Sequence, residues 1–398
     1  MKLLVVSSWF PYPPDNGSKL RAYHLMRELS KRHAITLLSF AEPGEEKHVA
    51  GLVDICTTIR TVPGNPFKAG SLGLRGLLSP LPRSYAQTYS PAMQALVNER
   101  LPEHDAAIGL ELGAALYLKR IRSVARLFDG AEVTVLREQF TSQRHTVRRL
   151  RYGFTWLKYS RFMRDLIMGF DRATVVSENE REQMIRLGCA PSRVAVLPNG
   201  VDASNLSVTG SPQPGRLIYP GSMTYSANYD AVSYFLAEVY PLIRRARPDA
   251  ELAVTGSTEG VALERLPRHD GVVFTGHLPD IRTAIADSDV CVVPLRIGGG
   301  TRLKIIQSLA LGTPVVSTSK GAEGLDVTPE QDILLADTPQ QFARQVLRLV
   351  ADRVLREKLA MAGRQWVAGR YTWDKIALHL ESILSDIIQQ RPTGSIRK

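Results

Sequence analysis

Apolar, β-branched runs alternate with amphipathic helical patterns along most of the chain, which predicts parallel sheets covered by helices. In the front half, this pattern predicts strands and helices over residues 2–8, 19–32, 34–40, 106–110, 124–128, 172–177, 178–187 and 194–197. A second cycle predicts elements over residues 217–219, 229–245, 252–255, 272–274, 289–295, 301–311 and 315–318. Residues 63–92 show no clear period, and we expect them to form loops. The fold class is therefore α/β, with two doubly wound, Rossmann-like halves.

An Asn-Gly turn at 199–200 and the polar stretch 203–215 separate these halves and predict a linker. We expect an N-terminal domain over residues 1–205 and a C-terminal domain over 206–372. A last helix, over 373–391, has one apolar face formed by Ile376, Leu380, Ile383, Leu384 and Ile387.

The composition is typical of a water-soluble globular protein with a full core. The chain has 398 residues, of which 44% are hydrophobic and 22% are charged. No apolar run reaches the roughly 18 residues that a membrane-spanning helix needs. Its 3 cysteines are widely spaced and form no C-x-x-C pair, so we expect thiols in a reducing cytoplasm.

The net charge of +11 lies mostly in the front half. Residues 1–200 contain 28 Lys/Arg and 18 Asp/Glu, a balance of +10, while residues 201–398 contain 22 and 21. The segment 144–164 contains 7 cations and no acid, interleaved with aromatic residues. Such a segment suits an anionic membrane surface or a polyprenyl-diphosphate acceptor, and equally a solvated helix that packs its aromatic residues on the domain. No nucleic-acid motif accompanies the charge, so we expect no nucleic-acid partner.

The most specific local pattern is a glycine loop, Gly298-Gly299-Gly300, between a predicted strand and a predicted helix. Gly312 and Pro314 predict where that helix ends. Free N–H groups at a helix start attract anions, and Arg302 and Lys304 place two cations in the same first turn. We interpret this arrangement as a diphosphate site. A second glycine loop is predicted at residues 321–324.

Several segments together resemble the retaining glycosyltransferases of family four, which have the GT-B fold. In chain order they are PPDNGSKLRAYHL, PNGVD, GSMTYSANYDAVSYFL, VTG, VVFTGHLPDI, DSDVCVVPL and GGGTRLK, followed by LALG, PVVST and GAEGL. The run from residue 298 onward is similar to a branch that works on bacterial polysaccharides. The resemblance covers nearly the whole chain except residues 60–170. It implies two domains facing one another across a cleft and a C-terminal helix that crosses back to the front domain.

The resemblance also implies roles for individual residues. Lys304, with Arg302, would neutralise the departing nucleotide diphosphate. Phe274 to Leu278 would lie along the nucleobase, and Glu323 close to the sugar or ribose. The implied donor-binding residues are Gly17, Gly221, Ser222, Met223, Phe274, His277, Leu278, Gly298, Gly299, Gly300, Thr301, Gln307 and Glu323. The donor would be a nucleotide diphosphate sugar, the acceptor a glycan or lipid-linked sugar, and the transfer would retain the anomeric configuration.

One position departs from the family's E-x(7)-E pair, which falls on Gly299 and Gln307. The second glutamate normally accepts hydrogen bonds from ribose hydroxyls, and Gln307 keeps the size but loses the charge. A loss of about 1–2 kcal/mol in donor binding is expected. A non-catalytic or weakly active GT-B protein that binds nucleotide sugar or an enzyme partner therefore remains an alternative.

Other chemistries have weaker support in the residues. An Asp287-Ser288-Asp289 run imitates a metal motif but lies where a helix gives way to an apolar strand, so we expect no metal and no cofactor. No G-x-G-x-x-G follows the first strand, which disfavours a dinucleotide-dependent oxidoreductase. Asp129, Glu132 and His145 fall in the poorly matching acceptor region, and the sequence does not choose between them. The enzyme would associate with the inner face of the membrane if segment 144–164 binds lipid.

Overall fold

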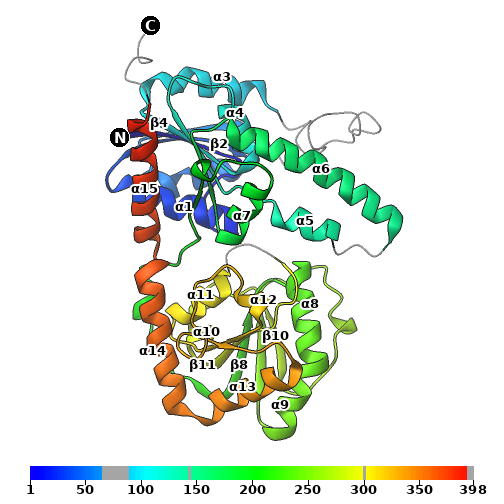
Figure 1. Ribbon diagram of the computed structural model, residues 1–398. Coiled ribbons are helices and arrows are strands. Elements are labelled where there is room, and N and C mark those ends of the chain that lie inside the picture. Colours follow the sequence, from blue (N-terminus) through cyan, green and yellow to red (C-terminus); the bar gives the residue numbers. More distant parts are fainter. Residues whose placement is uncertain (65–88, 142–144, 299–301, 392–398) are drawn as a thin grey trace. The chain divides into compact units, whose positions relative to one another are not determined.

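The computed structural model describes residues 1–64, 89–141, 145–298 and 302–391. These residues form two compact units, and each is treated separately below. Unit 1 contains residues 1–199 and the C-terminal segment from Trp373, and unit 2 contains residues 200–372. The division falls between the predicted Asn-Gly turn residues. Figure 1 shows the elements of both units.

Unit 1 is built on a 7-stranded parallel sheet with the strand order β3-β2-β1-β4-β5-β6-β7. The strands are β1 (Lys2–Ser7), β2 (Ala34–Ala41), β3 (Thr58–Pro63), β4 (Ala106–Leu110), β5 (Ala125–Asp129), β6 (Arg172–Val175) and β7 (Val194–Val196). The α-helices described are α1 (Gly17–Ser30), α3 (Pro91–Arg100), α4 (Glu111–Leu118), α5 (Thr134–Thr141), α6 (Thr146–Met168), α7 (Glu178–Arg186) and α15 (Trp373–Gln389). Short 3₁₀ turns are η1 (Glu45–Leu52), η2 (Leu101–Glu103) and η3 (Pro191–Arg193).

The unit 1 sheet is apolar on both faces because helices cover both, as expected for parallel strands. Leu4 and Val6 of β1 join one buried cluster, while Leu3 and Val5 join the other. The second cluster also contains the apolar face of α15, which packs on α1. Every residue predicted for that face is buried: Ile376, Leu380, Ile383, Leu384 and Ile387.

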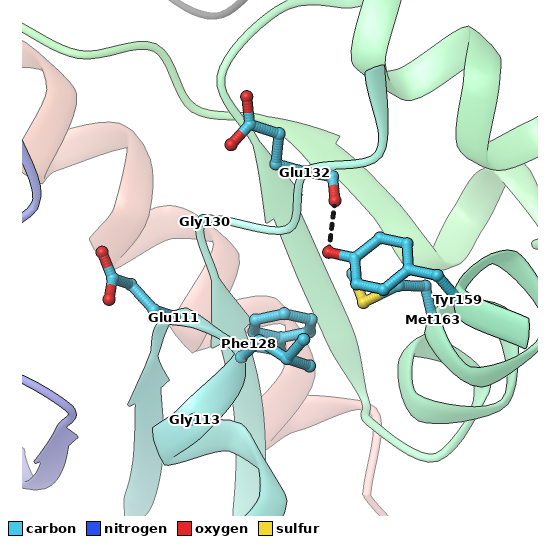
Figure 2. A pocket seen from close by; sticks show the side chains of 8 residues that line it. Glu111, Gly113, Phe128, Gly130, Glu132, Tyr159 and Met163 are labelled. Atoms are coloured by element: carbon cyan, nitrogen blue, oxygen red, sulfur yellow. Dashed lines mark hydrogen bonds between the residues drawn. The ribbon is translucent and has the colours of Figure 1, made fainter. Parts of the chain in front are cut away.

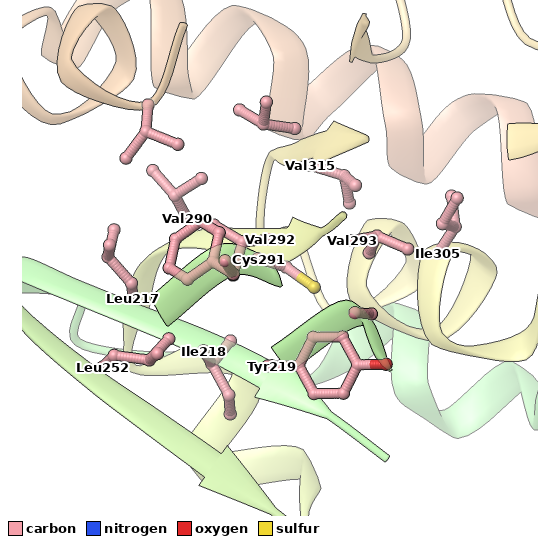
Figure 3. Close-up of a cluster of buried hydrophobic side chains, with 14 of the residues drawn as sticks. Leu217, Ile218, Tyr219, Leu252, Val290, Cys291, Val292, Val293, Ile305 and Val315 are labelled. Atoms are coloured by element: carbon pink, nitrogen blue, oxygen red, sulfur yellow. The ribbon is translucent and has the colours of Figure 1, made fainter. Parts of the chain in front are cut away.

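Unit 2 has a 6-stranded parallel sheet with the order β10-β9-β8-β11-β12-β13. Its strands are β8 (Gln213–Pro220), β9 (Glu251–Thr255), β10 (Val272–Gly276), β11 (Ser288–Val293), β12 (Val315–Ser317) and β13 (Leu334–Leu335). Its helices are η4 (Ala203–Ser207), α8 (Ser226–Tyr234), η5 (Phe235–Val239), α9 (Tyr240–Ala246), η6 (Leu263–Arg265), α10 (Arg282–Ala286), α11 (Leu303–Ala310), α12 (Ser319–Ala322), α13 (Pro339–Ala351) and α14 (Arg353–Arg370). Figure 3 shows the buried side chains of β8 and β11 packed against those of neighbouring elements. The predicted fold class, two Rossmann-like α/β halves, is confirmed.

Three local details differ from the prediction. The helix predicted over 229–245 is interrupted by the π-helical turn η5, just before Pro241. Proline lacks an N–H and its ring clashes with the preceding turn, and a π turn accommodates both. The second glycine loop is partly helical, since Gly321 and Ala322 belong to α12. A seventh strand, β3, was not predicted, and its last residue, Pro63, is the first residue of the region expected to be loop.

None of the described helices is both long enough and apolar enough to cross a membrane. The 3 cysteines, Cys56, Cys189 and Cys291, are buried as free thiols. Burial raises the pKa of the Cys291 thiol to about 12, so it is not a nucleophile at neutral pH.

Candidate active site

Glycine-containing loops collect at the carboxyl edge of the unit 2 sheet, where α/β folds bind ligands. Gly221 follows β8, Gly256 follows β9 and Gly298 lies in the loop after β11. These three strands are neighbours in the sheet. A Cβ on Gly256 would lie 2.6 Å from the amide nitrogen of Ser222, so the first two loops touch through their backbones. Glycine is needed there for close approach.

Lys304 enters this edge from the first turn of α11. Its ammonium donates hydrogen bonds to the Tyr219 hydroxyl (2.8 Å) and the Asn228 Oδ1 (2.7 Å), and it lies 4.3 Å from the centre of the Tyr219 ring. Part of the side chain reaches solvent, but the ammonium itself is enclosed. Desolvation lowers the pKa of Lys304 to about 7. Its hydrogen-bond partners among the described residues are neutral, so none of them balances the charge when the amine is protonated.

The structure begins α11 at Leu303, two residues later than predicted. Arg302 is the N-cap residue and does not lie in the first turn. Its buried guanidinium donates to the carbonyl oxygens of Gly298 (3.0 Å) and Lys320 (2.9 Å). It also forms an ion pair of 3.3 Å with Glu323, which pairs with Lys320 at 2.6 Å. Arg302 thus ties the loop after β11 to α12.

The other predicted donor-binding residues of unit 2 lie on the same sheet edge or on α11. Ser222 and the buried Met223 follow Gly221, and the Ser222 hydroxyl is 2.8 Å from that of Thr224. Phe274 ends the apolar part of β10, the edge strand beside β9, and His277 and Leu278 follow it. Gln307 is three residues after Lys304 and therefore on the same face of α11. Gly299, Gly300 and Thr301 lie outside the described residues.

Gly17 is the one predicted donor residue in unit 1. It is the first residue of α1, after the N-cap Asn16, whose side chain accepts from the Lys19 amide. A Cβ on Gly17 would meet no described atom within 4 Å. The fold of unit 1 therefore does not itself require glycine at this position, which leaves room for a ligand.

Unit 1 has its own cavity of about 150 Å³, at the carboxyl ends of β4 and β5. Figure 2 shows Tyr159 and Met163 of α6 on one side, Glu111 on the other and Gly130 between them. The Tyr159 hydroxyl donates to the backbone oxygen of Glu132 (2.8 Å), which fixes the phenol at the wall. The residues that line the cavity are Glu111, Leu112, Gly113, Phe128, Gly130, Glu132, Tyr159 and Met163.

Glu111 has an unusual backbone. Its φ of 65° lies in the left-handed region, which side chains other than glycine and asparagine adopt rarely and at a cost. Desolvation raises the pKa of its carboxyl group, while hydrogen bonds with Ser18 and Trp9 oppose that rise. Glu111 was not predicted from the sequence as a site residue. The only signal was its place directly after a buried strand.

A neighbouring cavity of about 190 Å³ lies beyond β1, β2 and β3. Its lining includes Trp9, Lys19 and Ser8, whose buried hydroxyl has no hydrogen-bond partner among the described residues. Lys19 in turn pairs with Glu45 at 3.1 Å.

The three acceptor candidates left open by the sequence have different environments. Asp129 is buried and bound by Arg21 through two bonds of 2.7 Å, so its carboxylate is part of the core. Glu132 lines the first cavity, and His145 is an exposed residue at the N-cap of α6. Of the three, Glu132 is the residue that lines a cavity described here.

No group of three or more His, Cys, Asp or Glu side chains in the described parts of the chain is placed to hold a metal ion. In the D-x-D run, Asp287 accepts from the Ser211 amide and Asp289 from the Gly215 amide, both at 2.8 Å. These carboxylates fasten the start of β8 to β11.

Comparison with known proteins matches both units to glycosyltransferase families. Residues 16–200 match the glycosyl transferase 4-like domain, and residues 214–352 match the glycosyl transferases group 1 family. A Klebsiella pneumoniae relative, an uncharacterized protein in the cps region, is 22% identical and covers 87% of this chain and 90% of its own. A Mycobacterium tuberculosis relative, a GDP-mannose-dependent alpha-(1-6)-phosphatidylinositol monomannoside mannosyltransferase, is 24% identical and covers 74% and 80%.

Solved structures with the same fold include HepE of Anabaena in complex with UDP and glucose. It has a TM-score of 0.67 and 13% identity, covering 96% of this chain and 99% of the other. Sucrose-phosphate synthase of Thermosynechococcus elongatus has a TM-score of 0.67 at 16% identity, covering 98% and 100%.

Proposed function

Because the chain is a glycosyltransferase of the GT-B type, with a 4-like domain followed by a group 1 domain, we propose that it transfers a sugar from a nucleotide diphosphate sugar to a glycan or lipid-linked acceptor. The transfer proceeds with retention of the anomeric configuration and without a metal ion. The observation that carries this proposal is Lys304, whose amine lies at the carboxyl edge of the unit 2 sheet and has neutral hydrogen-bond partners among the described residues.

Lys304 is suited to a diphosphate because its charge is not already balanced by a protein carboxylate. A Cβ on Gly221 would lie 3.2 Å from the Lys304 Nζ, so glycine keeps the approach to the ammonium open. The first N–H groups of α11 have no intrahelical acceptor, and an arginine at the N-cap has no acceptor to offer them. A diphosphate at this edge would accept hydrogen bonds from the ammonium and from the N–H groups at the start of α11. Together these groups stabilise the charge of a leaving nucleotide.

Arg302 has a different role in this proposal. Its guanidinium is engaged with backbone oxygens on both sides of the glycine loop and with Glu323. It therefore shapes the loop that meets the diphosphate. Lys304 supplies the charge that the leaving group needs.

The finer assignments have support from relatives. The Klebsiella relative is named for a cps region, which favours a role in polysaccharide biosynthesis. The mycobacterial relative is named as GDP-mannose-dependent, and a structural neighbour is described with UDP and glucose. Because these names involve different nucleotides, the nucleobase and sugar of the donor are left to the experiment.

Donor binding and hydrolysis with a panel of UDP and GDP sugars test this function. We expect Lys304→Ala to lower nucleotide release at least about 100-fold, by analogy with the loss of one stabilising group at a leaving or attacked oxygen. Lys358→Ala removes an exposed lysine of the same unit and serves as the control. Full turnover by Lys304→Ala would refute the assignment.

Gln307 favours a second function, that of a non-catalytic nucleotide-sugar binder. It lies one turn from Lys304, where the family has a glutamate that accepts from the ribose. Saturable nucleotide-sugar binding without nucleotide release, in both the wild type and Gln307→Glu, would establish this second function.

We further propose that α6 places the enzyme on the anionic inner surface of the membrane. At its N-terminal half, four apolar side chains spaced by three and four residues share one face, and they are 45–81% exposed: Val147, Leu150, Phe154 and Leu157. Arg151, Lys158 and Arg161 are interleaved with them, and the Lys158 ammonium lies 4.6 Å from the centre of the Phe154 ring. Basic and apolar groups on one exposed face suit a bilayer interface with acidic lipids.

Flotation with phosphatidylserine-containing vesicles at physiological salt tests this location. Leu150→Glu with Phe154→Glu should abolish flotation, whereas Val354→Glu with Met361→Glu, exposed apolar positions of α14, should not. A wild-type protein that stays in the soluble fraction would show instead that α6 is a solvated helix.

A further inference from the structure

The unit 1 cavity differs chemically from the edge of unit 2. None of its eight lining residues is cationic, and two are glutamates. The remaining polar group at the wall is the Tyr159 hydroxyl, and apolar surface comes from Phe128 and Met163. A phosphate would be repelled here, whereas hydroxyl groups can donate to carboxylates while a ring packs on the apolar wall. The lining therefore favours a neutral, hydroxylated ligand.

The size of the cavity restricts that ligand. At about 150 Å³ it is smaller than the roughly 300–1,000 Å³ of a site for a drug-sized molecule. Gly130, between β5 and α5, has a φ of 83°, and a Cβ there would meet no described atom within 4 Å. One sugar ring is the scale of ligand that such a space accepts.

Glu111 lines the cavity and has a strained backbone conformation. The strain is not needed to build the sheet, because β4 ends at Leu110 and glycine would adopt the same φ at no cost. Strained residues are found where the surrounding structure holds a side chain for a task. Ser18 at the start of α1 and Trp9 after β1 hydrogen-bond with the Glu111 carboxyl group and orient it.

We propose that this cavity binds one neutral pyranose ring of the acceptor and that Glu111 positions it by accepting a hydrogen bond from a sugar hydroxyl. This inference rests on the proposed transferase function and deepens it, because it names the chemical class and the subsite of the acceptor. The Ser8 hydroxyl lines the neighbouring cavity and has no hydrogen-bond partner among the described residues, so it offers a further polar group to an acceptor that extends beyond one ring.

Saturation-transfer NMR with the methyl glycosides of glucose, galactose, mannose and N-acetylglucosamine tests the subsite on the full-length protein. At least one glycoside should receive saturation in the wild type and lose it in Glu111→Gln and Glu111→Gly. In a transfer assay, both variants should raise the acceptor KM about 10- to 100-fold, the loss of a hydrogen bond to a charged group. Nucleotide-sugar affinity, in which Glu111 has no assigned role, should change less than twofold.

Glu330→Gly is the matched control, because Glu330 also has a left-handed φ, of 63°, but lies on the surface of unit 2. Both glycine variants should have a Tm equal to or higher than that of the wild type. Only Glu111→Gly should raise the acceptor KM. The acceptor KM of the wild type should also rise as pH falls and Glu111 is protonated, and Glu111→Gln should remove that dependence.

Three outcomes would overturn the proposal. The glycosides could bind equally well to the Glu111 variants, or Glu111→Gly could lower the Tm and thereby show a structural role. Calorimetry with calcium chloride could reveal a cation site that Glu111→Gln removes. Each of these leaves the proposed transferase intact as long as a nucleotide sugar binds to unit 2. If no nucleotide sugar binds, the proposed function itself fails.

Discussion

Lys304 is expected to take up a proton when a nucleotide sugar binds. Its pKa is lowered to about 7 in the unliganded protein because the ammonium is desolvated beside the neutral Tyr219 and Asn228. At pH 8 a group with this pKa is about 90% deprotonated. A diphosphate placed against the amine favours the charged form and draws a proton from solution.

The size of the effect follows from the distance. At a contact of about 4 Å and an effective dielectric constant of about 20, one unit charge attracts the ammonium by about 4 kcal/mol. That energy corresponds to about 3 pKa units, so the pKa of Lys304 in the complex rises to about 10. Binding at pH 8 should then take up about 0.9 proton. Donor affinity should fall about 50-fold between pH 7 and pH 9, because the proton must be acquired from an increasingly dilute source.

Calorimetry in two phosphate-free buffers with different ionisation enthalpies measures the proton uptake directly. A nucleotide sugar is a better ligand than a nucleoside diphosphate for this purpose, since its diphosphate is substituted at both ends and does not titrate near neutrality. Lys304→Met should bind more weakly and take up almost no proton, while Lys358→Met should behave as the wild type. Tight binding without proton uptake at pH 8, or equal uptake by Lys304→Met, would refute the reasoning.

Four further predictions follow from the described contacts. Without ligand, Lys304→Met should have a higher Tm than the wild type at pH 7, and the gap should close as pH rises toward about 10, because the lowered pKa makes folding of the wild type more favourable as the proton is lost. Gln307→Glu should tighten nucleotide-sugar binding by about 1–2 kcal/mol in calorimetry, and unchanged affinity would contradict a ribose contact. Asp129→Asn should lower the free energy of unfolding by about 3–5 kcal/mol in urea titrations, because it leaves the buried Arg21 without its carboxylate; a change below about 1 kcal/mol would contradict this. EDTA should leave nucleotide release unchanged, and activity restored only by added Mg²⁺ or Mn²⁺ would overturn metal independence.

The sequence predicted α11 and the two strands beside it, because the signals for these elements come from residues within one turn or one strand. Gly312 ends α11 with a φ of 79° and donates to the Leu309 carbonyl, as expected of a glycine after the last helical residue. The strand before it and the strand after it were also predicted to within a few residues. These features depend on neighbours in the chain, which the sequence shows directly.

Contacts between distant residues could not be predicted in the same way. Gly321 was assigned to a loop because glycine is common in turns, yet it lies in α12. A Cβ there would be 2.7 Å from the Val293 oxygen, so glycine is needed for close packing against β11. Likewise, the sequence did not indicate which protein groups Arg302 contacts. Its partners, Lys320 and Glu323, lie about twenty residues further along the chain and are brought to it only by the fold.

The structure shows where some of the cations of the front half lie relative to the unit 1 cavity. Its excess of cations predicted an anionic partner, but the cavity in unit 1 carries glutamates. Arg148, Arg149 and Arg151 lie instead on the exposed N-terminal half of α6, whose buried C-terminal half contributes Tyr159 and Met163 to the cavity wall. One helix therefore joins a surface suited to acidic lipid with a space suited to a neutral sugar. An acceptor with an uncharged sugar on an anionic lipid carrier could contact both the N-terminal half of α6 and the cavity. A free oligosaccharide would contact only the cavity. If the enzyme uses a lipid-linked acceptor, Leu150→Glu with Phe154→Glu should raise the KM for that acceptor in vesicles and leave the KM for a soluble methyl glycoside unchanged. An equal effect on both acceptors would separate the basic face of α6 from acceptor recognition.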